Sequence, residues 1–205
     1  MGRWRARRRD HTARVVSGLG LVRAGDRVAT PWRNGEGLTS EVAAGPEGAG
    51  LSDFAWRVSI ATIAQDSEFS PFRHVDRWLV PLDEPGLELD IDGTRRLIER
   101  HSTVTFTGEA DVAAREVHAP SRDLNLMVDR RRCRGALSVM QLQGEALVRT
   151  SPAQWVVVVA LDGPVRVHPL GCMEALDALV IPPSETVALS GDGPLAIAQV
   201  ELRAR

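Results

Sequence analysis

Short apolar stretches separated by turn residues constrain the fold of this 205-residue chain more than any other feature. Stretches of four to seven residues, β-branched or alternating in character, end repeatedly at Gly, Asp or Pro. Such spacing is typical of antiparallel barrels and sandwiches, and no stretch predicts a long helix. We expect strands at 21–28 (with a turn at 24–26), 39–43, 54–63, 78–82, 87–91, 103–107, 115–119, 138–142, 144–150, 155–161, 165–167, 178–181, 186–189 and 195–202. Segment 95–100 is ambiguous, and 123–129 is a short polar-apolar segment that precedes three arginines.

The strands fill both halves of the chain, which predicts an all-β protein made of two similar units packed into one body, as in a doubled jelly roll. We place the lobes at about 19–117 and 118–205. Residues 1–18 carry six arginines and one aspartate, a local charge of about +5 in a chain of net charge −2. They predict a disordered extension. The remainder is acidic and has no electrostatic footprint for phosphate backbones, so we expect no nucleic-acid partner.

Metal and cofactor chemistry finds little support in the sequence. Cys133 and Cys172 are the two cysteines, and they lack zinc-site spacing; the five histidines form no HxH pair. We predict no metal and no cofactor, although a site with two histidines and one carboxylate, assembled over long range, stays open. The cysteine usage fits a reducing cytoplasm. No apolar run reaches eighteen residues, so we expect no membrane span. A homodimer is compatible with the sequence.

The stretch Pro31–Gly37 cannot form an ordinary strand, because it combines a turn former, an aromatic, a cation, an amide and two glycines. Pro31 fixes its own φ and lacks a donor, whereas the glycines permit positive φ and close backbone approach. One interpretation is a surface loop between two strands. The other is a loop that presents Trp32, Arg33 and Asn34 to a ligand.

Residues 54–63 alternate with period two. One face carries Trp, Val and Ile, while the other carries Arg57, Ser59 and an alanine. This second face is either exposed to water or lines a polar pocket inside a barrel. Arg33, Arg57 and Arg77 each lie near Trp, Ser, Asn or Asp, where a guanidinium suits a carboxylate that it can bind with two hydrogen bonds. No GxSxG elbow and no reactive cysteine setting is present.

Four motifs in the same order resemble the HutD/Ves family. The segment 31–41 (PWRNGEG, then Thr39 and Glu41) is similar to the family's PWKNGGG-T-E opening. The other three segments are similar to its WRVSIA strand, its FS-x-FPG-x-DR segment and its RDFNLM segment, and lie at 56–61, 69–77 and 122–127. The departures are Arg33 for lysine, Glu36 for glycine, Arg73-His74 for Pro-Gly and Leu124 for phenylalanine.

The resemblance implies a bicupin, that is, two RmlC-like jelly-roll barrels in one body, without the usual cupin metal ligands. It also implies a small-molecule binding or regulatory role, linked in some members to histidine utilisation and in others to stress responses. Members of the histidine branch are thought to sense an intermediate with carboxylate or formyl groups. The resemblance attaches no enzymatic activity.

We therefore predict a carboxylate-binding protein with no assigned catalytic residue. Trp32 would form an apolar wall, and Arg33 and Arg57 would pair the anion. Asp76 and Asp123 would orient the arginines. The predicted ligand-binding set is Trp32, Arg33, Asn34, Arg57, Ser59, Asp76, Arg77, Asp123 and Asn125. The alternative is a metal-independent hydrolase or isomerase with Asp76 or Asp123 as general base, which requires a carboxylate of raised pKa. Nearby arginines are expected to lower that pKa.

Overall fold

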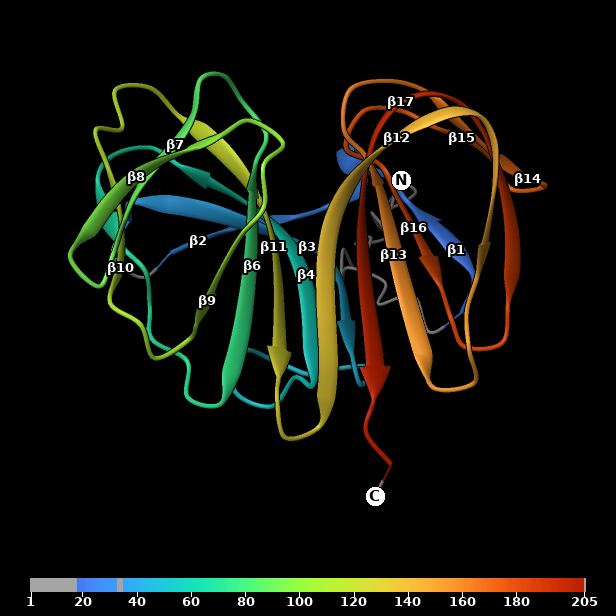
Figure 1. The fold of residues 1–205 in the computed structure, drawn as a ribbon, viewed down its shortest axis with the longest axis horizontal. Coiled ribbons are helices and arrows are strands. Elements are labelled where there is room, and N and C mark those ends of the chain that lie inside the picture. Colours follow the sequence, from blue (N-terminus) through green and yellow to red (C-terminus); the bar gives the residue numbers. More distant parts are fainter. Residues whose placement is uncertain (1–17, 33–34, 205) are drawn as a thin grey trace, which may run out of the picture.

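The computed structural model describes residues 18–32 and 35–204, and almost all of its regular structure is β (Figure 1). One 3-10 turn, η1 (Ala24–Asp26), lies near the start of the described part. The strands are β1 (Gly20–Val22), β2 (Ala29–Pro31), β3 (Gly37–Gly45), β4 (Trp56–Ile63), β5 (Ser67–Glu68), β6 (Val75–Pro81), β7 (Gly86–Ile91), β8 (Thr94–Glu99), β9 (Val104–Thr107), β10 (Val112–Arg115), β11 (Ser121–Asp129), β12 (Cys133–Arg149), β13 (Gln154–Ala160), β14 (Val165–His168), β15 (Gly171–Met173), β16 (Ala178–Ile181) and β17 (Thr186–Leu202). The prediction of an all-β protein is confirmed.

Three antiparallel sheets make up the described residues. A six-stranded sheet has the order β2-β3-β4-β11-β6-β9, and a four-stranded sheet has the order β5-β10-β7-β8. A seven-stranded sheet runs β1-β16-β13-β17-β14-β15, with β12 paired to β17. Figure 1 shows β2 to β11 in one half and β12 to β17 in the other, where β1 joins them. The chain therefore crosses between the halves after β1 and again between β11 and β12.

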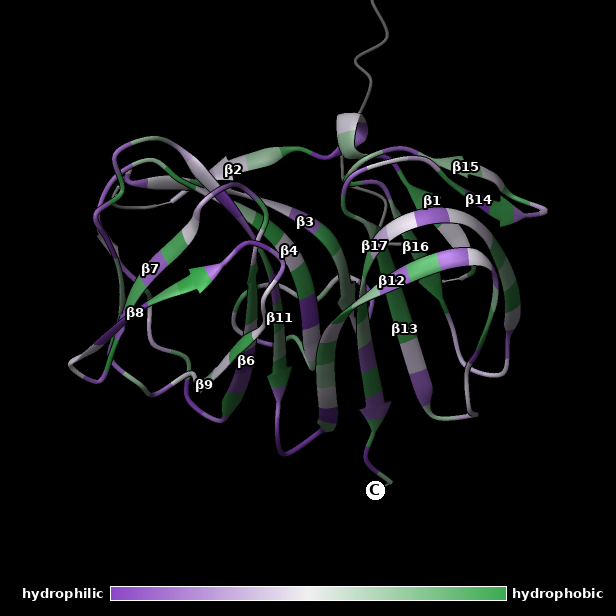
Figure 2. Cartoon of the chain, turned by 45° about the horizontal axis from the view of Figure 1, so that its top comes forward, coloured by the Kyte–Doolittle hydropathy of each residue, from purple (hydrophilic) through white to green (hydrophobic). Residues whose placement is uncertain are grey.

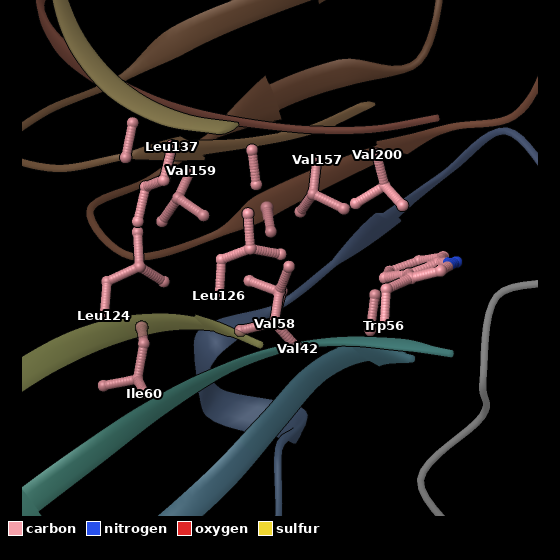
Figure 3. Close-up of a cluster of buried hydrophobic side chains, with 14 of the residues drawn as sticks. Val42, Trp56, Val58, Ile60, Leu124, Leu126, Leu137, Val157, Val159 and Val200 are labelled. Carbon is pink, nitrogen blue, oxygen red and sulfur yellow. The ribbon is translucent and has the colours of Figure 1, made fainter. Parts of the chain in front are cut away.

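A shared hydrophobic core joins the two halves (Figure 3). Alternation along β4 directs Trp56, Val58 and Ile60 toward this core, and Leu126 of β11 joins them. The seven-stranded sheet contributes buried residues such as Val157, so the two sheets stack on apolar side chains. Figure 2 shows hydrophilic and hydrophobic residues alternating along strands of both halves.

The opposite face of the six-stranded sheet carries polar side chains. The register places Ser59 of β4 beside Asn125 of β11, and Asn125 beside Leu79 of β6. In the next row on this face, Arg57, Met127 and Arg77 are cross-strand neighbours. These polar residues are largely buried: Ser59 is 2% exposed and Asn125 6% exposed. Of the two interpretations of this face, the structure has the interior one.

Two expected pairs of strands are single long strands. Segments 138–142 and 144–150 belong to β12, and segments 186–189 and 195–202 belong to β17. The glycines that predicted breaks, such as Gly144, Gly191 and Gly193, have positive φ, yet pairing continues through them. Their conformational freedom bends the strands instead of ending them.

Other boundaries also shift. The strand expected at 115–119 ends at Arg115, because β10 covers Val112–Arg115 and the residues after it are irregular. Segments 95–100 and 123–129 fall in strands β8 and β11, and the short strand β15 was not predicted. The Asp92-Gly93 turn does join β7 and β8, with φ of 50° and 80°. The lobe boundary predicted at 117/118 falls before β11, although β11 pairs with β4 and β6 in the first half of the structure. The arginine-rich residues 1–17 lie outside the described residues, and no helix in the described part could cross a membrane.

Candidate functional site

A cavity of about 980 Å³ lies on the polar face of the six-stranded sheet. β3, β4, β6 and β11 supply side chains to its wall, and β5 with the segment after it closes one side. Six residues of the predicted ligand-binding set line this cavity: Trp32, Arg57, Ser59, Arg77, Asp123 and Asn125. The structure therefore brings together segments that are nearly a hundred residues apart in the sequence.

Arg77 is a buried cation with no ion-pair partner among the described residues. It is 8% exposed, and its guanidinium lies 5.1, 5.9 and 5.0 Å from the ring centroids of Phe69, Phe72 and Phe106. The aromatic faces attract the cation and fix its position. Its one hydrogen bond runs from Nη1 to the carbonyl of Ser70 at 3.4 Å, and Nε has no partner. Burial lowers the pKa of Arg77 to about 10, which leaves it charged at neutral pH.

Asp123 is a buried carboxyl group on the neighbouring strand. It is 1% exposed, its Oδ2 accepts a hydrogen bond from Nδ2 of Asn125, and its Oδ1 has no partner in the described structure. Burial raises the pKa of Asp123 to about 7, and the hydrogen bond from Asn125 and the charge of Arg77 only partly oppose this shift. The sequence-based expectation is correct for the effect of Arg77, which lowers this pKa, but the net pKa is raised because removal from water outweighs a cation that forms no direct ion pair.

Arg57 is already paired. Its Nε donates to Oε2 of Glu41 at 2.9 Å, and its Nη1 donates to the hydroxyl of Ser59 at 3.3 Å. The Arg57 side chain is 13% exposed and that of Glu41 is 29% exposed, so the pair lies at the wall of the cavity where solvent still reaches it. Glu41 neutralises the charge of Arg57 and occupies its Nε–H group, so Arg57 attracts an anion less than an unpaired guanidinium would.

The loop at the start of the first motif holds Trp32 against the cavity. The Trp32 indole N–H donates to the hydroxyl of Thr39 at 2.7 Å, and the Trp32 amide donates to the carbonyl of Gly37 at 2.9 Å. A Cβ at Gly37 would lie 2.7 Å from the backbone carbonyl oxygen of Thr62 and 3.0 Å from the indole ring, so a larger residue would have to displace the backbone there. The predicted site residues Arg33 and Asn34 lie outside the described residues.

Asp76 is not part of the cavity wall. Its carboxylate accepts a hydrogen bond from Nε of Arg130 at 2.7 Å, and its side chain is 41% exposed. Because Asp76 and Arg77 are consecutive on β6, their side chains point to opposite faces of the sheet. Asp76 therefore orients Arg130 and not Arg57 or Arg77, contrary to the role expected from the sequence.

The structure also shows features that the sequence analysis did not assign to the site. The three phenylalanines around Arg77 and the carboxylate of Glu41 belong to it. Phe69 and Phe72 precede Arg77 closely enough in sequence to have been suspected. Phe106 reaches Arg77 because β9 pairs with β6, with Phe106 opposite Arg77. In residues 18–32 and 35–204, no group of three or more His, Cys, Asp or Glu side chains is arranged to hold a metal ion.

Comparisons with known proteins show the family of the chain. The HutD family model matches residues 24–198. An uncharacterised 21.2 kDa protein in the hutC 3′ region of Pseudomonas putida is 36% identical over 60% of this chain and 64% of its own length. Protein Ves of Cronobacter sakazakii is 37% identical over 64% of this chain and 70% of its own length. The first match spans slightly less than two thirds of the relative.

Solved structures give the same answer for the fold. HutD from Pseudomonas fluorescens SBW25 superposes with a TM-score of 0.79 at 28% identity, covering 91% of this chain and all of that one. A cupin 2 conserved barrel domain protein from Leptotrichia buccalis has a TM-score of 0.62 at 10% identity over 92% of this chain and 99% of its own, which shows a cupin-like fold alone. The family match spans most of the chain and the sheets agree with solved relatives, and on this evidence the chain belongs to the HutD family.

Proposed function

We propose that the cavity binds a small carboxylate metabolite and that Arg77 binds its carboxylate group. The observation that carries the proposal is a guanidinium that is 8% exposed, has no ion-pair partner and lines a cavity of about 980 Å³. An unpaired buried charge costs several kcal/mol in general, so proteins rarely hold one without a use. A bound carboxylate would supply the missing hydrogen-bond acceptors.

Arg57 plays a secondary part in this proposal. Because Glu41 already accepts its Nε hydrogen bond, Arg57 can offer a ligand its remaining N–H groups without losing its partner. Trp32, Phe69 and Phe72 give the apolar surface that small-molecule pockets commonly have. The sequence-based assignment of Arg33 and Arg57 as the anion pair is therefore revised in favour of Arg77.

The physiological ligand in this proposal is an acid of histidine breakdown, and the role is regulatory. Support comes from the family to which the chain belongs and from the P. putida relative, which is described by its place beside hutC. The HutD structure from P. fluorescens was obtained in a formate condition, and formate is the smallest carboxylate with which to probe the cavity.

Calorimetric titration with formate, formylglutamate and urocanate tests this function. We expect saturable binding by at least one of these acids, a strong loss in Arg77→Lys, and a smaller loss in Arg57→Ala. Arg122→Ala is the matched control, because Arg122 precedes Asp123 on β11 and pairs with Asp83 away from the cavity. Absence of binding by all three acids, or unchanged binding in Arg77→Lys, would contradict the site.

A second candidate function is acid–base catalysis by Asp123 on the bound acid. The observation that favours it is the pKa of about 7 that burial gives this carboxyl group, which suits a general base near neutral pH. Product analysis by NMR after incubation with each acid measures turnover. Conversion that Asp123→Asn abolishes would establish the enzyme, and unchanged acids after long incubation would dismiss it.

The two-barrel interpretation of the fold belongs with this proposal. One cupin-type barrel would be formed by the six- and four-stranded sheets around the cavity, and the other by the seven-stranded sheet around its own apolar cluster. A crystal structure in which the seven-stranded sheet stays open and encloses no interior would argue against two barrels.

A further inference from the structure

We propose that a carboxylate ligand enters this cavity together with one proton, which Asp123 takes up, so that two carboxyl groups share a proton beside Arg77. The inference rests on the proposed function, since it describes how the same cavity accommodates an anion. It adds a coupling between ligand binding and pH that the family membership does not supply.

The charges on the cavity wall carry the argument. Arg77 is 8% exposed and Asp123 is 1% exposed, and no salt bridge within 4 Å joins them. Together they are neutral when Asp123 is ionised. A ligand carboxylate bound by Arg77 would then leave one excess negative charge in a site with little water. Two carboxylates that share a buried site do not both remain ionised, and one of them holds a proton.

The hydrogen-bond inventory points the same way. Oδ2 of Asp123 accepts a hydrogen bond from the amide of Asn125, whereas Oδ1 has no hydrogen-bond partner in the described structure. An ionised Oδ1 can only accept, and a carboxylate ligand can only accept as well, so the two would repel. A protonated Oδ1 donates an O–H hydrogen bond to the ligand. The proton comes from solvent, and it returns to solvent when the ligand leaves.

The other charged groups around the cavity do not replace this proton. Arg57 on β4 is compensated by Glu41 on β3 at 2.9 Å. Glu68 on β5 is paired with Arg115 at 2.6 Å. No histidine in the described part of the chain lines the cavity. Besides Arg77 on β6, Asp123 is thus the one charged or titratable wall group in the described residues that has no direct ion pair. Asn125 also has an unpartnered oxygen, Oδ1, but an amide does not titrate in this range.

The experiment is titration of the full-length protein with formate from pH 5.5 to 8.5, in two buffers of different ionisation enthalpy at each pH. Free formate stays ionised over this range, so a proton taken up on binding enters the complex, where Asp123 and the bound formate share it. We expect flat affinity below about pH 7 and a fall of about tenfold per pH unit above it. Proton uptake should rise from near zero at pH 5.5 toward one per formate at pH 8.5.

Two variants and one neutral probe sharpen the test. Asp123→Asn fixes the neutral form, so formate should bind with flat affinity and no proton uptake. Asp83→Asn is the control, because Asp83 pairs with Arg122 outside the cavity and its loss should leave the wild-type profile. Formamide has no charge and should bind without proton uptake in the wild type.

The outcomes separate the two proposals. Formate binding with constant affinity and no proton uptake would overturn the proton coupling and leave the carboxylate site intact. No formate binding at any pH would overturn both. Were Asp123→Asn unable to fold, as judged by its thermal transition, the proton count in the wild type would decide alone.

Discussion

The interiors of the two halves differ although both rest on one shared core. In the second half, β13 directs Val157 and Val159 to the shared core and Val156 and Val158 to a second apolar cluster. In the first half, β4 sends its aromatic and aliphatic residues to the same shared core, but its other face bears Arg57 and a serine. β13 is thus apolar on both faces, whereas β4 is apolar on one face.

Under the proposed function, this difference places ligand binding and stability in different halves of one fold. Filling the second interior with fully buried side chains contributes roughly 1.5–3 kcal/mol for each large aliphatic group. The first interior gives up part of that gain, because Arg77 and Asp123 are buried without ion-pair partners among the described residues and each leaves one polar atom without a hydrogen bond. Groups that destabilise the free protein and await a ligand are typical of functional sites. Under the proposed function, the first half therefore binds the ligand, and the second half contributes much of the stability.

The largest effect should come from truncating the second interior. Leu189 of β17 is 1% exposed in the apolar cluster, and Leu189→Ala should lower the free energy of unfolding by about 2–5 kcal/mol. Denaturant unfolding measures the loss, and formate affinity of the folded variant should stay at the wild-type value. Leu79→Ala is the matched change in the first half, where Leu79 neighbours Asn125 and affinity should also change. A loss of formate affinity in folded Leu189→Ala would contradict the prediction that the second half contributes to stability and not to binding.

Replacing the buried cation should affect binding more than stability. Arg77→Met keeps an unbranched side chain against the aromatic rings and removes a charge that has no ion-pair partner among the described residues. Formate affinity should fall roughly ten- to hundredfold, the worth of charged hydrogen bonds of about 1.5–3 kcal/mol. The free energy of unfolding should stay equal or rise, because a desolvated charge is exchanged for an apolar group. A fall in stability of several kcal/mol would instead make Arg77 a structural residue.

The raised pKa of Asp123 should be detectable without any ligand, in the pH dependence of stability. Its folded pKa of about 7 lies above the ordinary value of 3.8, so the folded state holds this proton more tightly than the unfolded state. The stability contributed by the group is present below about pH 4, falls as pH rises to about 7 and is then constant. Denaturant unfolding at pH 4.5, 6 and 8 should show a decline in the wild type relative to Asp123→Asn of more than about 1 kcal/mol. Parallel curves for the two proteins would contradict the buried acid.

Much of the fold and part of the site could be predicted from the sequence, since period-two patterns report which residues share a face. The alternation in β4 identified Arg57 and Ser59 as one polar face, and the structure places both on the cavity. The pattern cannot show which neighbour a long side chain meets. Arg57 pairs with Glu41 because β3 lies beside β4, a fact of sheet order that β4 alone does not contain.

The misassigned roles have physical reasons too. Asp76 could have been excluded by the same alternation, since its neighbour Arg77 faces the cavity. The direction of the pKa shift of Asp123 could not have been predicted. It depends on whether burial, which raises the pKa, outweighs the charge of Arg77, which lowers it, and the sequence shows neither the burial nor the distance. The glycines of β12 and β17 predict turns locally, and tertiary pairing overrides them.

The smallest effect should come from Glu36, the charged residue that stands where the resemblance has a glycine. Its backbone carbonyl accepts a hydrogen bond from the amide of Ala64 at 3.2 Å, and Glu36 is not among the residues that line the cavity. A charge outside the cavity acts through screened solvent and is worth less than about 1 kcal/mol. Glu36→Gln should therefore change formate affinity less than about threefold.

The matched change is Glu41→Gln, which neutralises a carboxylate that does line the cavity and binds Arg57. Freeing that guanidinium for the ligand should strengthen formate binding several-fold, with the gain shrinking as salt rises. Titration of both variants at about 0.05 and 0.5 M salt separates them. Were Glu36→Gln to strengthen binding tenfold and Glu41→Gln to leave it unchanged, the anion would be bound at the Trp32 loop, and the centre of the site would move there from Arg77.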